Sequence, residues 1–363
     1  MRLAMVNATR RWGGVKTWTL DVARMLSRFG HRVSIHCRPG PFLDAAQGLG
    51  LDARPFAFGM DYGPGAIMRF RRLFRAEGVD LVMVNVGKDM RTAGVAARLA
   101  GIPVVQRVGL PRDMRDTAKV RLTHRFVRPK LLAPCAHIRD EMANELSFVR
   151  PEDVTVVLTG KEPAPQAPDA VSEPRRIVCT SQLNADKGHA DLLRALAACR
   201  NAGHDFQLDI LGTGREENAL KTLVSELDLD SRVRFHGFTT EVGAALAKAD
   251  LFALPSLSEG LPNTLLEAMA QGLPAVARNV GGVAEAWPAP SGDTAWARDF
   301  LVAPEPGPAR LERALDAALA VPGDAWLERK RTVWSWFRES LSLESQARQL
   351  EARLLEVVTE GRK

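Results

Sequence analysis

The chain has 363 residues, of which 46% are hydrophobic and 25% are charged, a balance typical of globular proteins with ample material for a core. This length exceeds what one hydrophobic core usually supports, so we expect two domains. No apolar stretch approaches a membrane span and the first residues do not read as a signal peptide, which disfavours a transmembrane or exported protein and predicts a cytoplasmic location.

The net charge of +6 is unevenly distributed along the chain. Residues 1–150 carry 26 Lys and Arg against 12 Asp and Glu. Many of these basic residues gather in two helix-like segments, at 69–75 and 112–130. They indicate either two solvated helix faces or a surface for an anionic partner, such as an acidic membrane or a phosphorylated glycolipid. Nucleic acid is not expected as a partner, because we find no base-stacking pattern of aromatic residues here.

The first predicted strand, residues 2–7, is followed by Gly13 and Gly14 and then by a helix over 15–29. Glycines between a strand and a helix let the backbone approach a ligand, and the helix N-terminus behind them favours a phosphate. A glycine pair is also common in ordinary turns. His31 opens the second strand, and we interpret it as a structural residue.

Strand and helix patterns then alternate to residue 146, which predicts βαβ units and a parallel sheet. The loops after the predicted strands 80–85 and 103–107 lie at the carboxyl edge of that sheet, where α/β folds bind ligands. We expect their polar residues to face a cleft between the domains: Lys88, Asp89, Arg91, Arg107, Arg112 and Asp113.

A segment rich in proline and polar residues, 161–174, has the composition of a semi-rigid linker. The second domain then begins with a strand at 176–181, after which Gln182 and Lys187 lead into a helix. A lysine at this position can neutralise a diphosphate. The strand at 206–211 ends in the turn Gly212-Thr213-Gly214, and Phe238 follows the strand at 233–237.

The most informative stretch, residues 249–285, reads as a strand, a tight loop, a helix and a second strand. Gly260, Leu261 and Pro262 lie in the loop, and the helix begins at Asn263 and Thr264. The helix N-terminus directs amide N–H groups at an anion, while Glu259 and Glu267 flank the same pocket and accept hydrogen bonds from hydroxyl groups. Either glutamate alone would also fit an ordinary surface residue. Together these features suit a sugar nucleotide.

This stretch resembles the nucleotide-recognition segment of retaining GT-B glycosyltransferases, specifically the family 4-like, group 1 enzymes. The family segment reads P-S-x-x-E-G-x-P-x-x-x-L-E-A-M-A-x-G-x-P-V-V. The matching residues are Pro255, Ser256, Glu259, Gly260, Pro262, Leu266, Glu267, Ala268, Met269, Ala270, Gly272, Pro274 and Val276. The resemblance implies an α/β protein of GT-B fold, with two Rossmann-like doubly wound parallel-sheet domains facing across a cleft and a last helix that crosses back to the first domain.

The same resemblance implies roles for the site residues. Lys187 and the amides of Gly13 and Gly14 would stabilise charge on the leaving diphosphate. Glu259 would orient the sugar hydroxyls, and Glu267 would hold the ribose. Further donor contacts are expected from Gln182, Gly212, Gly214, Phe238, Gly260, Leu261, Pro262, Asn263 and Thr264.

Two positions depart from the family pattern. Gly109 stands where many relatives carry a histidine that contacts the transferred sugar, and Gln182 stands in place of an arginine. Arg107 or Asp89 could supply the missing polar group at the reacting sugar, and each could equally belong to a structural ion pair.

These assignments predict an acceptor-side domain over 1–162, a linker over 163–174, a donor-binding domain over 175–340 and a terminal helix over 341–363. We predict a retaining glycosyltransferase that moves a hexosyl or related unit from a nucleotide-diphosphate sugar to a hydroxyl of an anionic glycolipid or saccharide acceptor. No metal or other cofactor is expected, and the enzyme would act in the cytoplasm or at the inner face of the membrane. The alternatives are a GT-B nucleotide-sugar epimerase, a hinged ligand-binding protein and a non-catalytic sugar-nucleotide-binding homologue.

Overall fold

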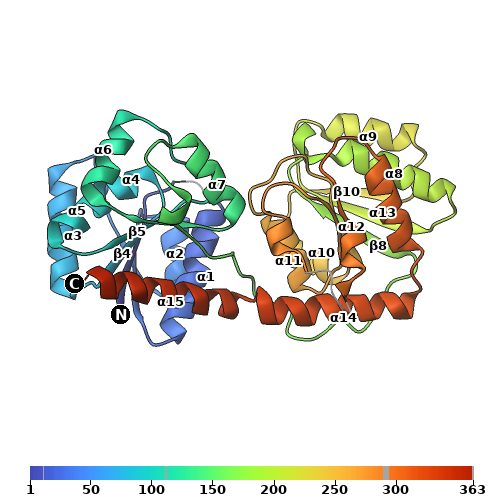
Figure 1. The fold of residues 1–363 in the computed structure, drawn as a ribbon. Coiled ribbons are helices and arrows are strands. Elements are labelled where there is room, and N and C mark those ends of the chain that lie inside the picture. Colours follow the sequence, from blue (N-terminus) through green and yellow to red (C-terminus); the bar gives the residue numbers. More distant parts are fainter. Residues whose placement is uncertain (11, 111–112, 289–293, 362–363) are drawn as a thin grey trace. The chain divides into compact units, whose positions relative to one another are not determined.

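The computed structural model describes residues 1–10, 12–110, 113–288 and 294–361, so Arg112 of the second basic segment lies outside the described residues. The chain divides into two compact units (Figure 1). Unit 1 comprises Met1–Thr159 with Leu343–Lys363, and unit 2 comprises Gly160–Ser342. Each is built on one parallel sheet, which confirms the predicted α/β class with two Rossmann-like domains. Among the described helices, none combines the length and the apolar character needed to cross a bilayer.

Unit 1 contains a seven-stranded sheet in the order β3-β2-β1-β4-β5-β6-β7. Its strands are β1 (Arg2–Asn7), β2 (Arg32–Cys37), β3 (Asp52–Pro55), β4 (Leu81–Val84), β5 (Val104–Arg107), β6 (Lys130–Ala133) and β7 (Val154–Val156). Its helices are α1 (Gly14–Arg28), α2 (Pro41–Gly48), α3 (Pro64–Glu77), α4 (Gly87–Asp89), α5 (Val95–Ala100), α6 (Ala118–Val127), α7 (Ala136–Glu145) and α15 (Leu343–Gly361), with a π-helical segment, η1 (Met90–Gly94), and a short 3₁₀ turn, η3 (Pro151–Asp153).

Helices cover both faces of the sheet in unit 1. Successive side chains of a strand point to opposite sides, so the central strands are buried on both faces. Leu3 and Met5 of β1 pack with α1, α2 and α15 on one face, whereas Ala4 packs with α3 and α5 on the other. Phe70 and Phe74 of α3 alternate with the arginines of the first basic segment, and both are fully buried. The aromatic residues of α3 therefore belong to the core, whereas Arg69, Arg72 and Arg75 are exposed.

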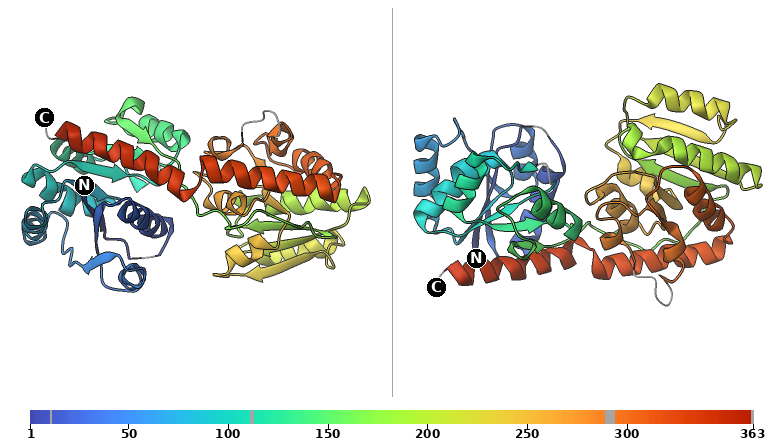
Figure 2. Two further views of the ribbon diagram at one scale, coloured as in Figure 1. Left: turned by 90° about the horizontal axis from the view of Figure 1, so that it is seen from below. Right: turned by 45° about the horizontal axis from the view of Figure 1, so that its top comes forward.

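The terminal helix α15 packs against α1 within unit 1 (Figure 2). Leu350, Leu354 and Val358 on this helix are buried in the hydrophobic core beside the strands. Nε2 of His31 lies 2.6 Å from Oε1 of Glu351 on α15. The last helix thus completes one face of the first sheet.

Unit 2 contains a six-stranded sheet in the order β10-β9-β8-β11-β12-β13. Its strands are β8 (Arg175–Thr180), β9 (Phe206–Leu211), β10 (Val233–Gly237), β11 (Leu251–Leu254), β12 (Ala275–Arg278) and β13 (Leu301–Val302). Its helices are α8 (His189–Asn201), α9 (Glu217–Glu226), α10 (Val242–Ala247), α11 (Asn263–Ala270), α12 (Ala297–Phe300), α13 (Ala309–Leu319) and α14 (Gly323–Ser340), with 3₁₀ turns η4 (Ala185–Lys187) and η5 (Ala284–Ala286).

Each sheet reverses its strand order at one point, between β1 and β4 in unit 1 and between β8 and β11 in unit 2. Open α/β sheets bind ligands beyond the carboxyl ends of the strands at such a point. The loops that follow these four strands are therefore the first places to look for a site. The glycine pair and the following residues at 281–285 also predict the start of a helix from the sequence, but in the structure they lead only into the single turn η5.

The contribution of α15 to unit 1 can be tested with two neighbouring leucines. Leu354→Ala should lower the free energy of unfolding of unit 1 by about 2–5 kcal/mol, because it leaves a cavity in the core. Leu355 is 40% exposed, so Leu355→Ala should change that free energy by less than about 0.5 kcal/mol. Urea unfolding followed by hydrogen exchange of β1 and β2 measures both, and equal effects would contradict the assignment.

Candidate functional site

Lys187 and Glu259 meet at the switch point of unit 2. Lys187 ends the turn η4, which follows β8, and Glu259 lies in the loop between β11 and α11. Nζ of Lys187 lies 2.7 Å from Oε1 of Glu259 and donates a hydrogen bond of 3.1 Å to the carbonyl oxygen of Ser258. The side chains of Lys187 and Glu259 are only 18% and 15% exposed. The structure thus brings together two of the four predicted catalytic residues.

Gly212 and Gly214 hold the turn after β9 against the loop that follows β8. Gly212 has a φ of +140°, and a Cβ there would overlap the carbonyl oxygen of Ser181. A Cβ at Gly214 would overlap the carbonyl oxygen of Leu183 in the same way. Both glycines are required for this close backbone approach, so their contact in the structure is with the loop that carries Gln182.

The loop from Glu259 to Pro262 is fixed by the turn that replaces the expected helix. Gly281 has a φ of +57°, and a Cβ there would overlap the carbonyl oxygen of Glu259. The N–H of Gly282 donates a 2.7 Å hydrogen bond to the carbonyl oxygen of Gly260. These contacts set the position of the Glu259 carboxylate.

Helix α11 begins at Asn263, with Pro262 as its N-cap and Leu261 immediately before it. The amides of Asn263 and Thr264 belong to the first turn, so they have no acceptor within the helix. Oε1 of Glu267, one turn further, lies 2.8 Å from Nζ of Lys161. Sequence reasoning missed Lys161, because it lies in the segment that reads as a linker.

Two of the predicted donor residues, Gln182 and Phe238, have contacts that differ from those of the Lys187 and Glu259 pair. Oε1 of Gln182 accepts a 3.2 Å hydrogen bond from Nδ2 of Asn184, within its own loop. Phe238 is 79% exposed and follows β10, which is at the edge of the sheet. The structure therefore does not bring Phe238 to the Lys187 and Glu259 pair.

Arg278, at the end of β12, is fully buried and supports the loop after β11 from below. Nη1 donates a 2.5 Å hydrogen bond to the carbonyl oxygen of Pro255, and Nη2 donates one of 2.8 Å to that of Gly307. Nη2 also lies 2.7 Å from Oδ2 of Asp191 on α8. Sequence reasoning missed this role, because an arginine after three apolar residues also fits a strand that ends at the surface.

His189 opens α8 directly behind Lys187 and Gly188. It is buried, and a hydrogen bond of 3.1 Å joins its Nε2 to Oγ of Ser181. Burial, with a further contribution from Lys187, lowers the pKa of His189 to about 4. This histidine is therefore neutral at physiological pH and is not a source of positive charge.

In unit 1, Gly13 and Gly14 follow β1 and begin α1. The carbonyl oxygen of Gly13 accepts a 2.9 Å hydrogen bond from the N–H of Lys16. Among the described residues other than its two chain neighbours, none has an atom within 4 Å of a Cβ placed on Gly13, so these residues give no packing reason for a glycine there. The ammonium of Lys16 lies 5.2 Å from the ring centre of Phe42, and burial lowers its pKa. Sequence reasoning also missed this lysine.

Asp89 is completely buried and joins the two loops at the switch point of unit 1. Oδ1 accepts a 2.7 Å hydrogen bond from the N–H of Ala8, after β1. Oδ2 accepts bonds from the N–H groups of Asn85 (3.2 Å) and Val86 (3.1 Å), after β4. Burial raises the pKa of Asp89 to about 7, although these three donors oppose the shift.

Arg107 ends β5 and is buried against Trp18, with its guanidinium carbon 4.4 Å from the centre of the indole ring. Burial lowers the pKa of Arg107 to about 10, although Asp113 opposes this shift. A Cβ on Gly109 would lie 3.0 Å from Nη1 of Arg107. The guanidinium therefore lies directly beside position 109.

Comparisons with known proteins show which families the two parts of the chain match. The model of the family "Glycosyltransferase Family 4" matches residues 12–164, and that of "Glycosyl transferases group 1" matches residues 174–320. The amylovoran biosynthesis glycosyltransferase AmsK of Erwinia amylovora is 35% identical over 160 residues, which are 39% of this chain and 39% of that protein. The match thus covers well under half of the length of that relative.

Two further likenesses extend over most of the chain. A GDP-mannose-dependent alpha-(1-6)-phosphatidylinositol monomannoside mannosyltransferase of Mycobacterium tuberculosis is 27% identical, with 76% of this chain and 79% of that protein covered. The crystal structure of Anabaena Alr3699/HepE in complex with UDP and glucose superposes with a TM-score of 0.73 at 18% identity, covering 98% of this chain and all of that one. The fold is thus shared along nearly the whole chain.

The buried role of Arg278 can be tested against a second arginine that meets the same carboxylate. Arg278→Ala should lower the free energy of unfolding of unit 2 by about 3 kcal/mol, because it removes the buried guanidinium that pairs with Asp191 and donates to the carbonyl of Pro255. Arg194 lies 4.0 Å from Asp191 and is 49% exposed, so Arg194→Ala should cost at most about 1 kcal/mol. Chemical denaturation measures both, and a larger loss in Arg194→Ala would refute the role given to Arg278.

Proposed function

The chain belongs to the family 4-like, group 1 glycosyltransferases, and from this premise we propose that it transfers a glycosyl unit from a nucleotide-diphosphate sugar to an acceptor hydroxyl. The proposed transfer retains the anomeric configuration, as the resemblance to the retaining enzymes implies. The barrier is the departure of the diphosphate as the sugar ring gains oxocarbenium character. A catalyst for this step must stabilise negative charge on the leaving phosphate and hold the sugar.

The pair formed by Lys187 and Glu259 carries the proposal. An ammonium and a carboxylate 2.7 Å apart supply the two functions that the reaction needs at adjacent positions. On donor binding, Lys187 would turn to the leaving phosphate, and Glu259 would accept hydrogen bonds from sugar hydroxyls. A well-placed donor to developing negative charge is worth about 3 kcal/mol of barrier.

Glu267 and Lys161 form a second pair of a carboxylate and an ammonium. Its 2.8 Å contact places a carboxylate one turn inside α11, and we assign that carboxylate to the ribose hydroxyls. The free amides at the start of α11 and those at Gly13 and Gly14 would contribute partial positive charge toward phosphates. The proposal needs no metal ion, because these groups supply the positive charge.

For Asp89 and Arg107 the contacts support different roles. Asp89 accepts three backbone hydrogen bonds, which suits a residue that positions the loops after β1 and β4. Arg107 stays protonated at neutral pH, since its pKa is about 10. We propose that it supplies positive charge beside position 109, where the family pattern has a histidine.

The donor site can be tested with a panel of nucleotide-diphosphate sugars. The named likenesses include a protein bound to UDP and glucose and a GDP-mannose-dependent enzyme, so the panel should contain both bases. A donor at ~100 times its dissociation constant adds about 2.7 kcal/mol to stability and raises the melting temperature. We expect one member to give this shift and Lys187→Ala and Glu267→Ala to lose it.

Lys221→Ala provides the matched control for Lys187→Ala. Lys221 also lies in unit 2 and also pairs with a glutamate at 2.7 Å, but it is 50% exposed on α9. The donor shift should survive in this variant. A shift lost equally in both lysine variants, or absent for the whole panel, would refute the assigned donor site.

We propose that the acceptor is an anionic glycolipid or saccharide and that α6 meets the membrane surface. Leu122 and Phe126 are 70% and 45% exposed, and they lie four residues apart on one side of the helix. Arg121, Arg125 and Arg128 surround them and are exposed. A helix with exposed apolar and basic residues is suited to the interface of an anionic bilayer. The enzyme would then act at the inner face of the membrane.

Vesicle binding tests this surface. Vesicles of phosphatidylglycerol should bind more tightly than vesicles of phosphatidylcholine at about 0.15 M salt, where long-range attraction is screened. The double variant Leu122→Ser with Phe126→Ser should bind the anionic vesicles at least about tenfold more weakly, because two apolar side chains no longer insert. Leu99→Ser is the control, because Leu99 lies in unit 1 and is 46% exposed, about as much as Phe126. Equal binding of both vesicle types would exclude the membrane contact.

A further inference from the structure

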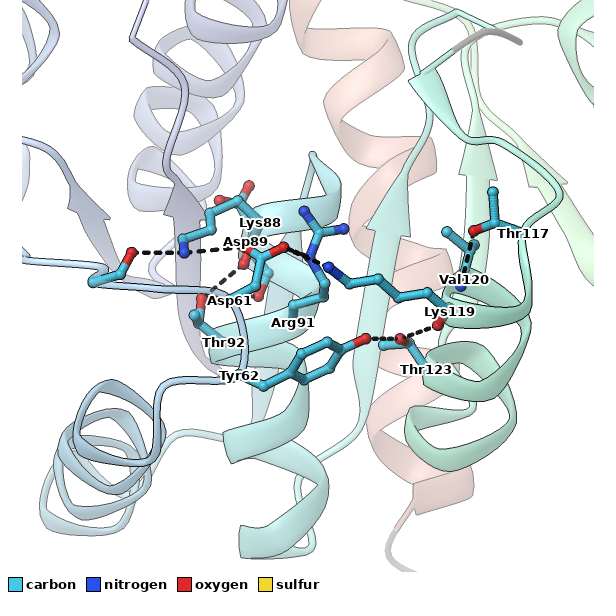
Figure 3. Close-up of polar contacts among 11 residues, drawn as sticks. Asp61, Tyr62, Lys88, Asp89, Arg91, Thr92, Thr117, Lys119, Val120 and Thr123 are labelled. Atoms are coloured by element: carbon cyan, nitrogen blue, oxygen red, sulfur yellow. Dashed lines mark hydrogen bonds and ion pairs between the residues drawn. The ribbon is translucent and has the colours of Figure 1, made fainter.

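One carboxylate in unit 1 is surrounded by three cations (Figure 3). Asp61 lies in the loop between β3 and α3, and its oxygens lie 3.1 Å from Nζ of Lys88, 2.6 Å from Nε of Arg91 and 2.9 Å from Nζ of Lys119. Partial burial of Asp61 opposes its ionisation, but the three cations lower its pKa to about 2. Asp61 is therefore a permanent anion in a positively charged setting.

A pocket of about 270 Å³ adjoins this cluster, within unit 1. Arg91 and Lys119 line it, together with Gly87 after β4, Gln106 of β5 and Thr123 of α6. The hydroxyl of Tyr62, next to Asp61, hydrogen bonds to that of Thr123. The loop that carries Asp61 is thus tied to three residues of the pocket wall, and the pocket lies at the carboxyl ends of β4 and β5, where α/β folds bind ligands.

The charges around the pocket do not balance. Arg115 also lines the pocket, and its guanidinium has no ion pair with any residue that the structure describes. Asp113 is a second carboxylate in the wall, and one of its oxygens accepts a 2.9 Å hydrogen bond from the N–H of Leu110. His124 hydrogen bonds to Gln106 and to the carbonyl of Val120, and burial lowers its pKa, which keeps it neutral. Among the described residues, three cations thus line the pocket, Arg91, Arg115 and Lys119, against one carboxylate, Asp113.

We propose that this pocket binds a phosphoryl group of the acceptor and that Asp61 is the internal anion with which it competes. The surplus of two positive charges matches a phosphate monoester, which carries about −1.5 to −2 charges at neutral pH, better than a carboxylate. Arginine is well suited to this ligand because its planar fork pairs with phosphate oxygens. The inference rests on the proposed function, because it specifies the acceptor of that reaction.

The size of the pocket limits what enters it. Pockets for drug-sized ligands have volumes of about 300–1,000 Å³, so a space of about 270 Å³ holds one charged group with its immediate neighbours. A phosphorylated sugar or a lipid phosphate would each place its phosphoryl group there. The rest of the acceptor would extend out of the pocket.

Calorimetric titration with glucose 6-phosphate tests the proposal, in a Lys187→Ala background that weakens the proposed diphosphate site of unit 2. Arg115→Ala with Lys119→Ala should weaken binding at least about tenfold, because two charged donors are lost. Asp61→Asn should instead strengthen binding by about threefold or more, because the competing carboxylate is gone. Unphosphorylated glucose should show no dependence on any of these variants.

Arg72→Ala is the matched control, since Arg72 is an exposed arginine of unit 1 on α3. It should leave the affinity for glucose 6-phosphate unchanged. Equal affinities in Arg72→Ala and the Arg115 and Lys119 double variant would overturn the proposal. Weaker binding in Asp61→Asn would overturn the competition, and Arg115→Ala alone, which does not touch Asp61, would still test the pocket.

Vesicles containing phosphatidic acid distinguish the two sources of the phosphoryl group. If the double variant weakens binding of these vesicles more than binding of glucose 6-phosphate, the acceptor is a lipid phosphate. If it weakens binding of glucose 6-phosphate more, the acceptor is a phosphorylated saccharide. Sugar-nucleotide stabilisation of the wild-type chain is measured in parallel. If a sugar nucleotide stabilises the wild-type chain but the double variant does not change phosphate binding, the proposed pocket is refuted and the proposed glycosyl transfer stands. If no sugar nucleotide stabilises the chain but the double variant weakens phosphate binding, the pocket stands and the proposed glycosyl transfer is refuted.

Discussion

The structure depends on how the backbone groups at the switch points are satisfied. Loops at the ends of buried parallel strands carry N–H and C=O groups that have no partner in the sheet, and burying them unpaired is costly. In unit 1, Asp89 accepts N–H groups from the loops after β1 and β4. In unit 2, Arg278 donates to the carbonyl of Pro255 after β11. Unit 1 thus uses a buried carboxyl group to accept backbone N–H groups, and unit 2 uses a buried guanidinium to donate to a backbone carbonyl.

This support leaves the side chains above it available for binding. Lys187 pairs with Glu259 and Lys161 with Glu267 in the part of the chain that the structure describes. Neither carboxylate is fully buried, with side-chain exposures of 15% and 37%, so a ligand can take over either partner without leaving a charge stranded in the core. Asp89 and Arg278, by contrast, are fully buried and have no such freedom. A site that binds and releases an anionic ligand needs rigidly held loops, such as those that Asp89 and Arg278 support, and ion pairs that can exchange partners, such as those of Lys187 and Lys161.

The sequence was sufficient for the fold and for part of the site. Alternating strand and helix patterns predicted the first parallel sheet, and the family resemblance implied the second sheet and a common donor for Lys187 and Glu259, which lie 2.7 Å apart. It did not reveal Lys161, Arg278 or the setting of Asp61, because each depends on a partner more than 20 residues away in the chain. Periodicity reports the burial of a segment but not which distant charge faces it. The single turn η5 was also missed, because the close approach of Gly281 to Glu259 is a tertiary constraint.

Gly109, which departs from the family pattern, is physically coupled to Arg107 at the end of β5. A side chain at position 109 would begin 3.0 Å from Nη1 of Arg107 and 3.5 Å from Oδ2 of Asp113, so an imidazole fits there only if the guanidinium moves. Arg107 is held by burial and by its stacking on Trp18, which makes that movement unfavourable. A buried arginine at 107 therefore favours a glycine at 109. Since the pKa of Arg107 is about 10, this corner offers a fixed positive charge where a histidine would offer a titratable one, so it can act on the reacting sugar electrostatically but not by exchanging a proton.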